Sequence, residues 1–299
     1  MTLASLSSTA SERSKALSRV ELLYGMAGLV GSLASGHLFM LYTSSLGRGI
    51  ILLIISTLLA VLCLLHAALL LQVKEVSSSE EEESCGLIPP SVQSEVPVQR
   101  ERNLTKIVLL YTAAILYSSA VGGAINVLGA FVLKEPLSWN AQQVGYGNAA
   151  GCLLFITSYL GVIGLRRYVS ETSLIMIGML SFTSGIYFMS FVTTTYMFYL
   201  ARSLNLFALI PLPTIRSLLS QQVPKSSCGM TLTVLQLVLK LAAAAYIPAS
   251  TKIYQSTLDW SPGFVFMLSS VFSVLAMIPI SIVGCRSQAK LQYETIQGD

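Results

Sequence analysis

Residues 107–133 read IVLLYTAAILYSSAVGGAINVLGAFVL, a run of 27 residues without a charged side chain. An α-helix rises about 1.5 Å per residue, so about 20 apolar residues are enough to cross the hydrocarbon of a bilayer. Backbone amides inside hydrocarbon have no water to bond, and a run of this length without strand-like alternation satisfies them only as a helix. The run therefore predicts a transmembrane helix.

Seven further stretches have the same character. Together with the first, the expected spans are Leu22–Tyr42, Gly49–Leu71, Ile107–Leu133, Val144–Leu165, Thr172–Val192, Thr195–Leu219, Gly229–Ser250 and Gly263–Gly284. The composition agrees, because 54% hydrophobic and 11% charged residues leave too little polar surface for a soluble globule of 299 residues. We expect an all-α membrane protein with eight transmembrane helices.

The distribution of lysine and arginine predicts the orientation. Segments outside the spans, taken alternately from the N-terminus, hold thirteen of these residues in one set and three in the other. By the positive-inside bias, both termini and the loop after the second span face the cytosol. That loop, residues 72–105, contains the acidic run Glu80–Glu83 and has the composition of a disordered linker. It separates residues 1–71 from a six-span part, 106–284, which a cytosolic tail follows at 285–299.

Charge, cysteine spacing and motifs argue against several classes of function. The net charge of +4 comes from lysines and arginines that follow the membrane topology, so we expect no nucleic-acid partner. The five cysteines lack the spacing of metal ligands, and we expect no metal, cofactor or disulfide. No nucleotide-binding, hydrolase or metalloprotease motif is found, so we do not expect an enzyme.

Five longer stretches resemble a known family. Glu21–Phe39, Leu137–Gly151, Leu174–Gly185, Thr195–Ser217 and Ile278–Val283 are similar to solute carrier family 46 of the major facilitator superfamily. This family includes the proton-coupled folate transporter and the thymic stromal cotransporter, and its members have twelve spans. The resemblance implies a major facilitator helical bundle in which this chain corresponds to spans five to twelve, without the first four.

Polar side chains inside the spans are candidate site residues. A charge near the bilayer centre costs about 2.5–3.5 kcal/mol on insertion scales, so it persists where it faces protein or water. Lys240 lies in the middle of the seventh span, and Arg202 lies about two turns inside the sixth. Each can hold an anionic substrate, and for Lys240 an ion pair that fixes helix packing is the alternative. Asn126, in the third span, has amide groups for a substrate or for a neighbouring helix.

Two further roles follow from the resemblance. In the family's folate transporter, the glutamate matching Glu21 is associated with proton coupling and the arginine matching Arg216 with substrate handling. We therefore expect Glu21 to serve proton coupling and Arg216 to lie on the substrate pathway. The alternatives are an interfacial acid paired with Arg19 and a positive-inside anchor.

Prolines and glycines supply the last candidates. Pro211 and Pro213 interrupt the sixth span and predict a gating hinge, with an adaptation to helix packing as the alternative. The first span predicts close helix packing, because it carries small residues at Gly25, Gly28, Gly31 and Gly36.

These observations predict a secondary transporter that moves a small organic anion of the folate, cyclic dinucleotide or muropeptide type by alternating access. Protons are the candidate coupling ion, and membrane lipid is the expected surrounding. The alternative is a nontransporting membrane protein that scaffolds or regulates a partner. We expect the plasma membrane as location, while sorting-like motifs at Glu83–Ile88 and Tyr293–Ile296 leave endosomes or lysosomes open.

Overall fold

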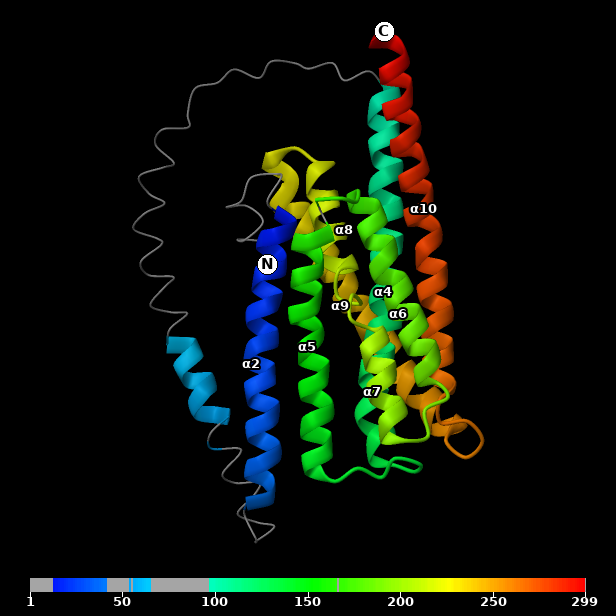
Figure 1. Cartoon of the computed structure of the whole chain (residues 1–299). Coiled ribbons are helices and arrows are strands. Elements are labelled where there is room, and N and C mark those ends of the chain that lie inside the picture. The colour runs from blue at the N-terminus through cyan, green and yellow to red at the C-terminus, as the bar shows by residue number, and fades with distance from the viewer. Residues whose placement is uncertain (1–12, 42–53, 55, 66–96, 166, 299) are drawn as a thin grey trace.

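The computed structural model describes residues 13–41, 54, 56–65, 97–165 and 167–298. All regular secondary structure in these residues is helical, as the sequence predicts. The labelled helices in Figure 1 are α2 (Arg13–Leu41), α4 (Pro97–Leu133), α5 (Ala141–Leu165), α6 (Glu171–Met189), α7 (Thr195–Leu204), α8 (Pro211–Gln221), α9 (Lys225–Thr257) and α10 (Phe264–Gly298). They run side by side as a bundle, and α2 begins at the end of the bundle where α10 finishes (Figure 1).

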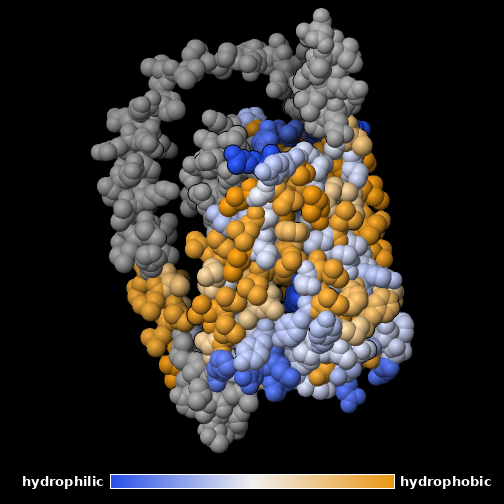
Figure 2. Space-filling view, in the orientation of Figure 1, coloured by the Kyte–Doolittle hydropathy of each residue, from blue (hydrophilic) through white to orange (hydrophobic). Residues whose placement is uncertain are grey.

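Five helical stretches in the described residues are long and apolar enough to cross a membrane. They are Leu104–Leu133, Ala141–Leu165, Glu171–Met189, Ser227–Thr257 and Phe264–Arg286, and they match five of the eight predicted spans. Figure 2 shows apolar residues over the middle of the visible face and polar residues gathered toward its two ends. This distribution is typical of a bundle whose middle lies in hydrocarbon.

The other three predicted spans have different outcomes. The first corresponds to part of α2, and the second is described only at residue 54 and in the short helix Ser56–Leu65. The sixth is divided between α7 and α8. The structure therefore supports a multi-pass helical protein, and the count of eight stays a prediction.

Two helices extend beyond their predicted ends. Helix α4 begins at Pro97, inside the segment 72–105 that we expected to be a linker, and residues 72–96 lie outside the described part. Proline is favoured in the first turn of a helix, and the glutamine, arginines and glutamate that follow are good helix formers. Helix α10 likewise continues through most of the predicted tail, to Gly298.

The core of the bundle surrounds α4. This helix packs along α9 and α10, and α10 also packs along α6. Tyr117, Phe131 and Phe266 are among the largest fully buried side chains, and the last two meet edge to face with ring centroids 5.0 Å apart. Helix α4 is therefore the element against which α9 and α10 are positioned.

Helix α2 packs mainly against α5, and glycines line much of that contact. A Cβ atom added at Gly36 would lie 3.2 Å from the Cα of Gly145 in α5, and additions at Gly25 and Gly28 would collide with α5 side chains. Gly31 has open space around it. Three of the four glycines in α2 thus lie where the two backbones approach closely, and the fourth faces away.

Candidate functional site

The sixth predicted span is interrupted in the middle. Helix α7 ends at Leu204, residues 205–210 form turns, and α8 begins at Pro211. In a continuous helix the nitrogens of Pro211 and Pro213 would have to bond the carbonyls four residues earlier, and proline has no N–H to donate. In the first turn of α8 that donor is not needed, so the prolines are tolerated there.

The carbonyl groups freed by the interruption are bonded by hydroxyl groups from three neighbouring helices. In hydrocarbon such carbonyls must find partners within the protein. The donors are Ser181 of α6 to the carbonyl of Leu204 (2.7 Å), Thr157 and Ser158 of α5 to that of Leu206 (2.7 and 3.2 Å), and Tyr117 of α4 to that of Ala208. The irregular segment is therefore held in place from α4, α5 and α6.

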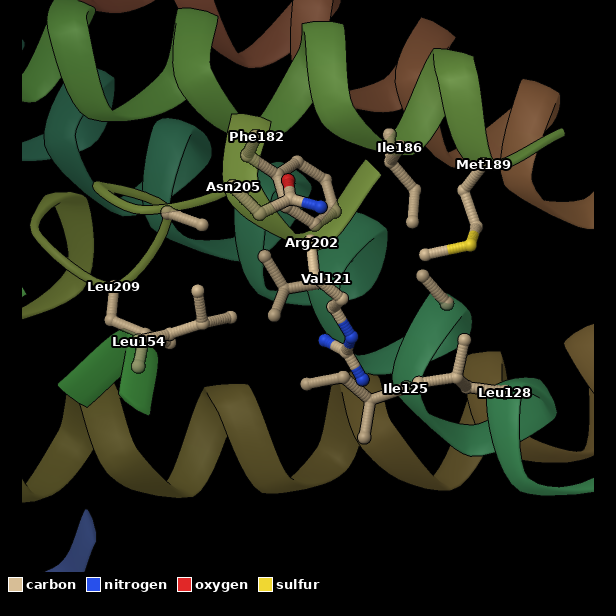
Figure 3. A pocket seen from close by; sticks show the side chains of 12 residues that line it. Val121, Ile125, Leu128, Leu154, Phe182, Ile186, Met189, Arg202, Asn205 and Leu209 are labelled. Carbon is tan, nitrogen blue, oxygen red and sulfur yellow. The ribbon is translucent and has the colours of Figure 1, made fainter. Parts of the chain in front are cut away.

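A small cavity of about 40 Å³ lies beside this segment. Its walls are apolar side chains of α4, α5 and α6, and its polar groups come from Arg202 and Asn205 (Figure 3). A single water needs about 10–15 Å³ measured in this way, so the cavity has room for a few waters. An organic substrate would need a wider opening than this conformation offers.

Arg202 extends from the last turn of α7 into the cavity. Figure 3 shows its guanidinium pointing away from Asn205 and toward Ile125 of α4. The guanidinium carbon lies 5.3 Å from the ring centre of Phe198, and Nη2 lies 3.5 Å from where a Cβ at Gly151 would be. Its Nε is buried and has no hydrogen-bond partner in the described part of the chain. Arg202 is thus a half-buried cation whose buried Nε has donor capacity left for an anion.

Asn205 follows the end of α7 and is 3% exposed. Its Nδ2 donates to the carbonyl of Ala201 (3.1 Å), while its buried Oδ1 has no partner among the described residues. Gly185 of α6 makes room for it, since a Cβ there would lie 2.5 Å from the Asn205 side chain. The sequence analysis missed Asn205, although a polar amide three residues after Arg202 and ahead of two prolines was a usable signal.

The other predicted pathway residues lie elsewhere. Asn126 joins α4 to α9, donating to Thr251 (2.9 Å), to Ser250 (3.2 Å) and to a backbone carbonyl. Lys240 is exposed on α9, the least buried of the five apolar helices. Arg216 is half-buried in α8. The structure does not gather these three around the cavity, and their roles stay predictions.

Three further predictions concern α2 and the interruption. Glu21 belongs to α2, but its side chain lies outside the described residues, so its role in proton coupling stays a prediction. Pro211 and Pro213 are buried at the start of α8, directly after the interruption. This position is compatible with a hinge, and the hinge itself stays a prediction.

Comparison with known proteins gives consistent matches. A family model described as Major Facilitator Superfamily matches residues 1–245. Solute carrier family 46 member 2 of Canis lupus familiaris is 41% identical over 99% of this chain and 66% of that relative. The Mus musculus protein of the same name is 39% identical over 98% of this chain and 65% of its own length.

A second group of relatives matches a shorter part. The lysosomal proton-coupled steroid conjugate and bile acid symporter SLC46A3 of Homo sapiens is 31% identical over 66% of this chain and 42% of that relative. The chain spans about two thirds of the length of the two member 2 relatives.

Proposed function

We infer that this chain is a multi-pass secondary transporter of organic anions, because it belongs to solute carrier family 46 of the major facilitator superfamily. Its transporter relatives support this class over that of an enzyme. Sites in secondary transporters commonly lie near the bilayer midplane, where a helix is discontinuous. The interruption between α7 and α8 is the feature of this chain that fits that pattern.

One observation carries the proposal: Arg202 and Asn205 bring buried polar atoms, without partners among the described residues, to a cavity beside an interrupted span. Such atoms are unfavourable in the folded protein unless a ligand or water bonds them. The guanidinium is a planar fork that matches a carboxylate, sulfate or phosphate. The apolar walls suit the hydrocarbon body of an organic anion. Widening of the cavity would be the step that admits it.

The substrate class follows from this chemistry and from the relatives. Folates, cyclic dinucleotides and muropeptides remain candidates, and bile acids and steroid conjugates join them because the SLC46A3 relatives carry those substrates in their name. The same name supports proton coupling, for which Glu21 is the proposed group. It also supports a lysosomal location beside the plasma membrane. Eight spans, with both termini cytosolic, complete the proposal.

The test is uptake of a labelled panel of these anions by cells that express the whole chain, at external pH 5.5 and 7.4. Arg202→Gln removes the charge, and charge-assisted hydrogen bonds contribute about 1.5–3 kcal/mol. We therefore expect the efficiency of anion uptake to fall about 10- to 150-fold. Arg202→Lys keeps the charge without the planar fork and should give an intermediate loss. Arg167→Gln, at an exposed arginine outside the cavity, is the matched control.

Two outcomes would oppose the proposal. A chain that inserts well but moves no anion of the panel would favour the nontransporting alternative. Uptake that is equal in the native chain and in Arg202→Gln would keep transport but remove the assigned site.

A further inference from the structure

A second and larger cavity lies among α4, α9 and α10, away from Arg202. Its volume is about 440 Å³, within the range of about 300–1,000 Å³ that is usual for small-molecule sites. Gly123 of α4, Ala245 and Ala249 of α9 and Phe272 of α10 are among the residues that line it. All of these residues lie within the helical stretches that are apolar enough to cross a membrane.

Helix arrangement and residue size explain why this space stays open. Helices α9 and α10 both pack along α4 but touch each other only over a short stretch. The residues that face the gap from α4 and α9 are mostly small, and even Gly123 could take a Cβ, whose nearest neighbour would be 3.7 Å away. The rim is exposed at Ala249 and Phe272. The cavity is therefore reached sideways, within the length of the spans.

Three hydroxyl groups in the cavity lack hydrogen-bond partners. Ser119, Tyr246 and Ser269 line it, and none of their hydroxyls bonds another group in the described part of the protein. Ser269 is only 5% exposed, so bulk solvent does not serve it. Ser250, by contrast, bonds the carbonyl of Ile247 and accepts from the side-chain amide of Asn126. Ser119 and Tyr246 are half-buried, and a molecule in the cavity would supply hydrogen bonds to all three hydroxyls.

The lining also limits the charge of that molecule. Among the residues that the structure describes, no lysine, arginine, histidine, aspartate or glutamate lines the cavity, and most of its surface is apolar. An ion would lose its hydration there without gaining a counter-charge. The molecule is thus uncharged and largely hydrocarbon, with a small hydrogen-bonding group. The rim lies within the length of the apolar helical stretches, so a molecule that enters there from the bilayer would fit this lining.

We propose that the cavity among α4, α9 and α10 binds a sterol from the bilayer, with the sterol hydroxyl placed near Ser119, Tyr246 and Ser269. A phospholipid fits less well, since its charged headgroup has no partner in the lining. This site is separate from the Arg202 cavity and does not depend on transport.

The experiment uses the whole chain purified into nanodiscs with a photoactivatable cholesterol analogue, followed by mass spectrometry of the labelled peptides. We expect label in peptides that contain Gly123, Ala245 or Phe272. Excess cholesterol should prevent this labelling, and excess phosphatidylcholine should not. Ala245→Phe fills the cavity and should lower this labelling at least about fivefold, a change of about 1 kcal/mol. Ala244→Phe adds the same ring at an exposed neighbour that does not line the cavity, and labelling should stay unchanged.

A second variant tests the polar contact. Ser269→Ala should weaken competition by cholesterol about three- to tenfold and leave competition by a sterol without the hydroxyl unchanged. The proposal is overturned if no label reaches these peptides, if Ala245→Phe and Ala244→Phe behave alike, or if phosphatidylcholine competes as well as cholesterol. Absence of label in a well-folded native chain would mean that water alone occupies the cavity.

Discussion

Replacing Asn205 with leucine should separate the stability of this protein from the transport activity that we propose for it. The substitution removes the buried Oδ1 that has no partner, and such an atom costs about 1–3 kcal/mol. It also removes the bond from Nδ2 to the carbonyl of Ala201, and leaving that carbonyl unbonded costs a similar amount. Leucine is close to asparagine in shape, so it should fit the space that Gly185 leaves. The two changes nearly cancel, and the free energy of unfolding should move by no more than about 1 kcal/mol.

Transport should respond differently. If Oδ1 and the Arg202 guanidinium bind the substrate together, the variant loses a hydrogen bond at the site, and uptake should fall at least about tenfold. The assay pairs uptake by cells with thermal melting of the purified protein in detergent. A shift of 1 kcal/mol corresponds to about 2–4 °C for a protein of this size class. Asn148→Leu, at an exposed asparagine of α5, is the control and should leave uptake unchanged.

Two results would refute this reasoning. A melting temperature lowered by 10 °C or more would mean that Asn205 holds the fold together and that its free oxygen is incidental. Unchanged uptake in a well-folded Asn205→Leu variant would remove the residue from the site.

Three other substitutions test contacts between the helices, each read by the melting temperature of the purified protein. Gly28→Leu should destabilise the protein by about 1–3 kcal/mol, because a Cβ there would already lie 2.9 Å from the sulfur of Cys152 in α5. Gly31→Leu has open space around it and should leave the melting temperature unchanged. Asn126→Leu should cost about 1 kcal/mol, since it removes the side-chain bonds between α4 and α9; no loss would mean that these bonds are replaced. Tyr117→Phe should cost about 1–3 kcal/mol by leaving the carbonyl of Ala208 unbonded, and an unchanged melting temperature would contradict that account.

Much of the fold could be predicted from hydrophobicity because the lipid requirement acts on each span separately. A run such as 107–133 must be helical whatever its neighbours are. The interruption of the sixth span was predictable too, since Pro211 cannot donate a backbone hydrogen bond. The start of α4 at Pro97 was not, because polar composition predicted a linker where helix propensity prevails.

The site was only partly predictable. Arg202 was found because a charged side chain inside a span is unfavourable unless it faces protein or water. Asn205 was missed although its position between Arg202 and the two prolines was a usable signal, and the sequence could not show that its oxygen has no partner among the described residues, because that depends on what α6 offers opposite it. Lys240 was found by the same signal as Arg202, and its role stays a prediction, because the direction in which a side chain leaves its helix depends on which face packs, and α9 packs along one narrow side.

The hydroxyl groups that bond the freed carbonyls also bear on how natural variation in this protein should be interpreted. Ser181→Ala or Thr157→Val would count as conservative exchanges, and neither residue carries charge or belongs to the Arg202 cavity. Ser181→Ala would nevertheless remove the hydroxyl that bonds the carbonyl of Leu204, and Thr157→Val would leave the carbonyl of Leu206 with Ser158 as its side-chain donor. An inherited substitution of this kind should therefore be weighed as a change to the support of the proposed site, although it looks mild in sequence and lies on a neighbouring helix.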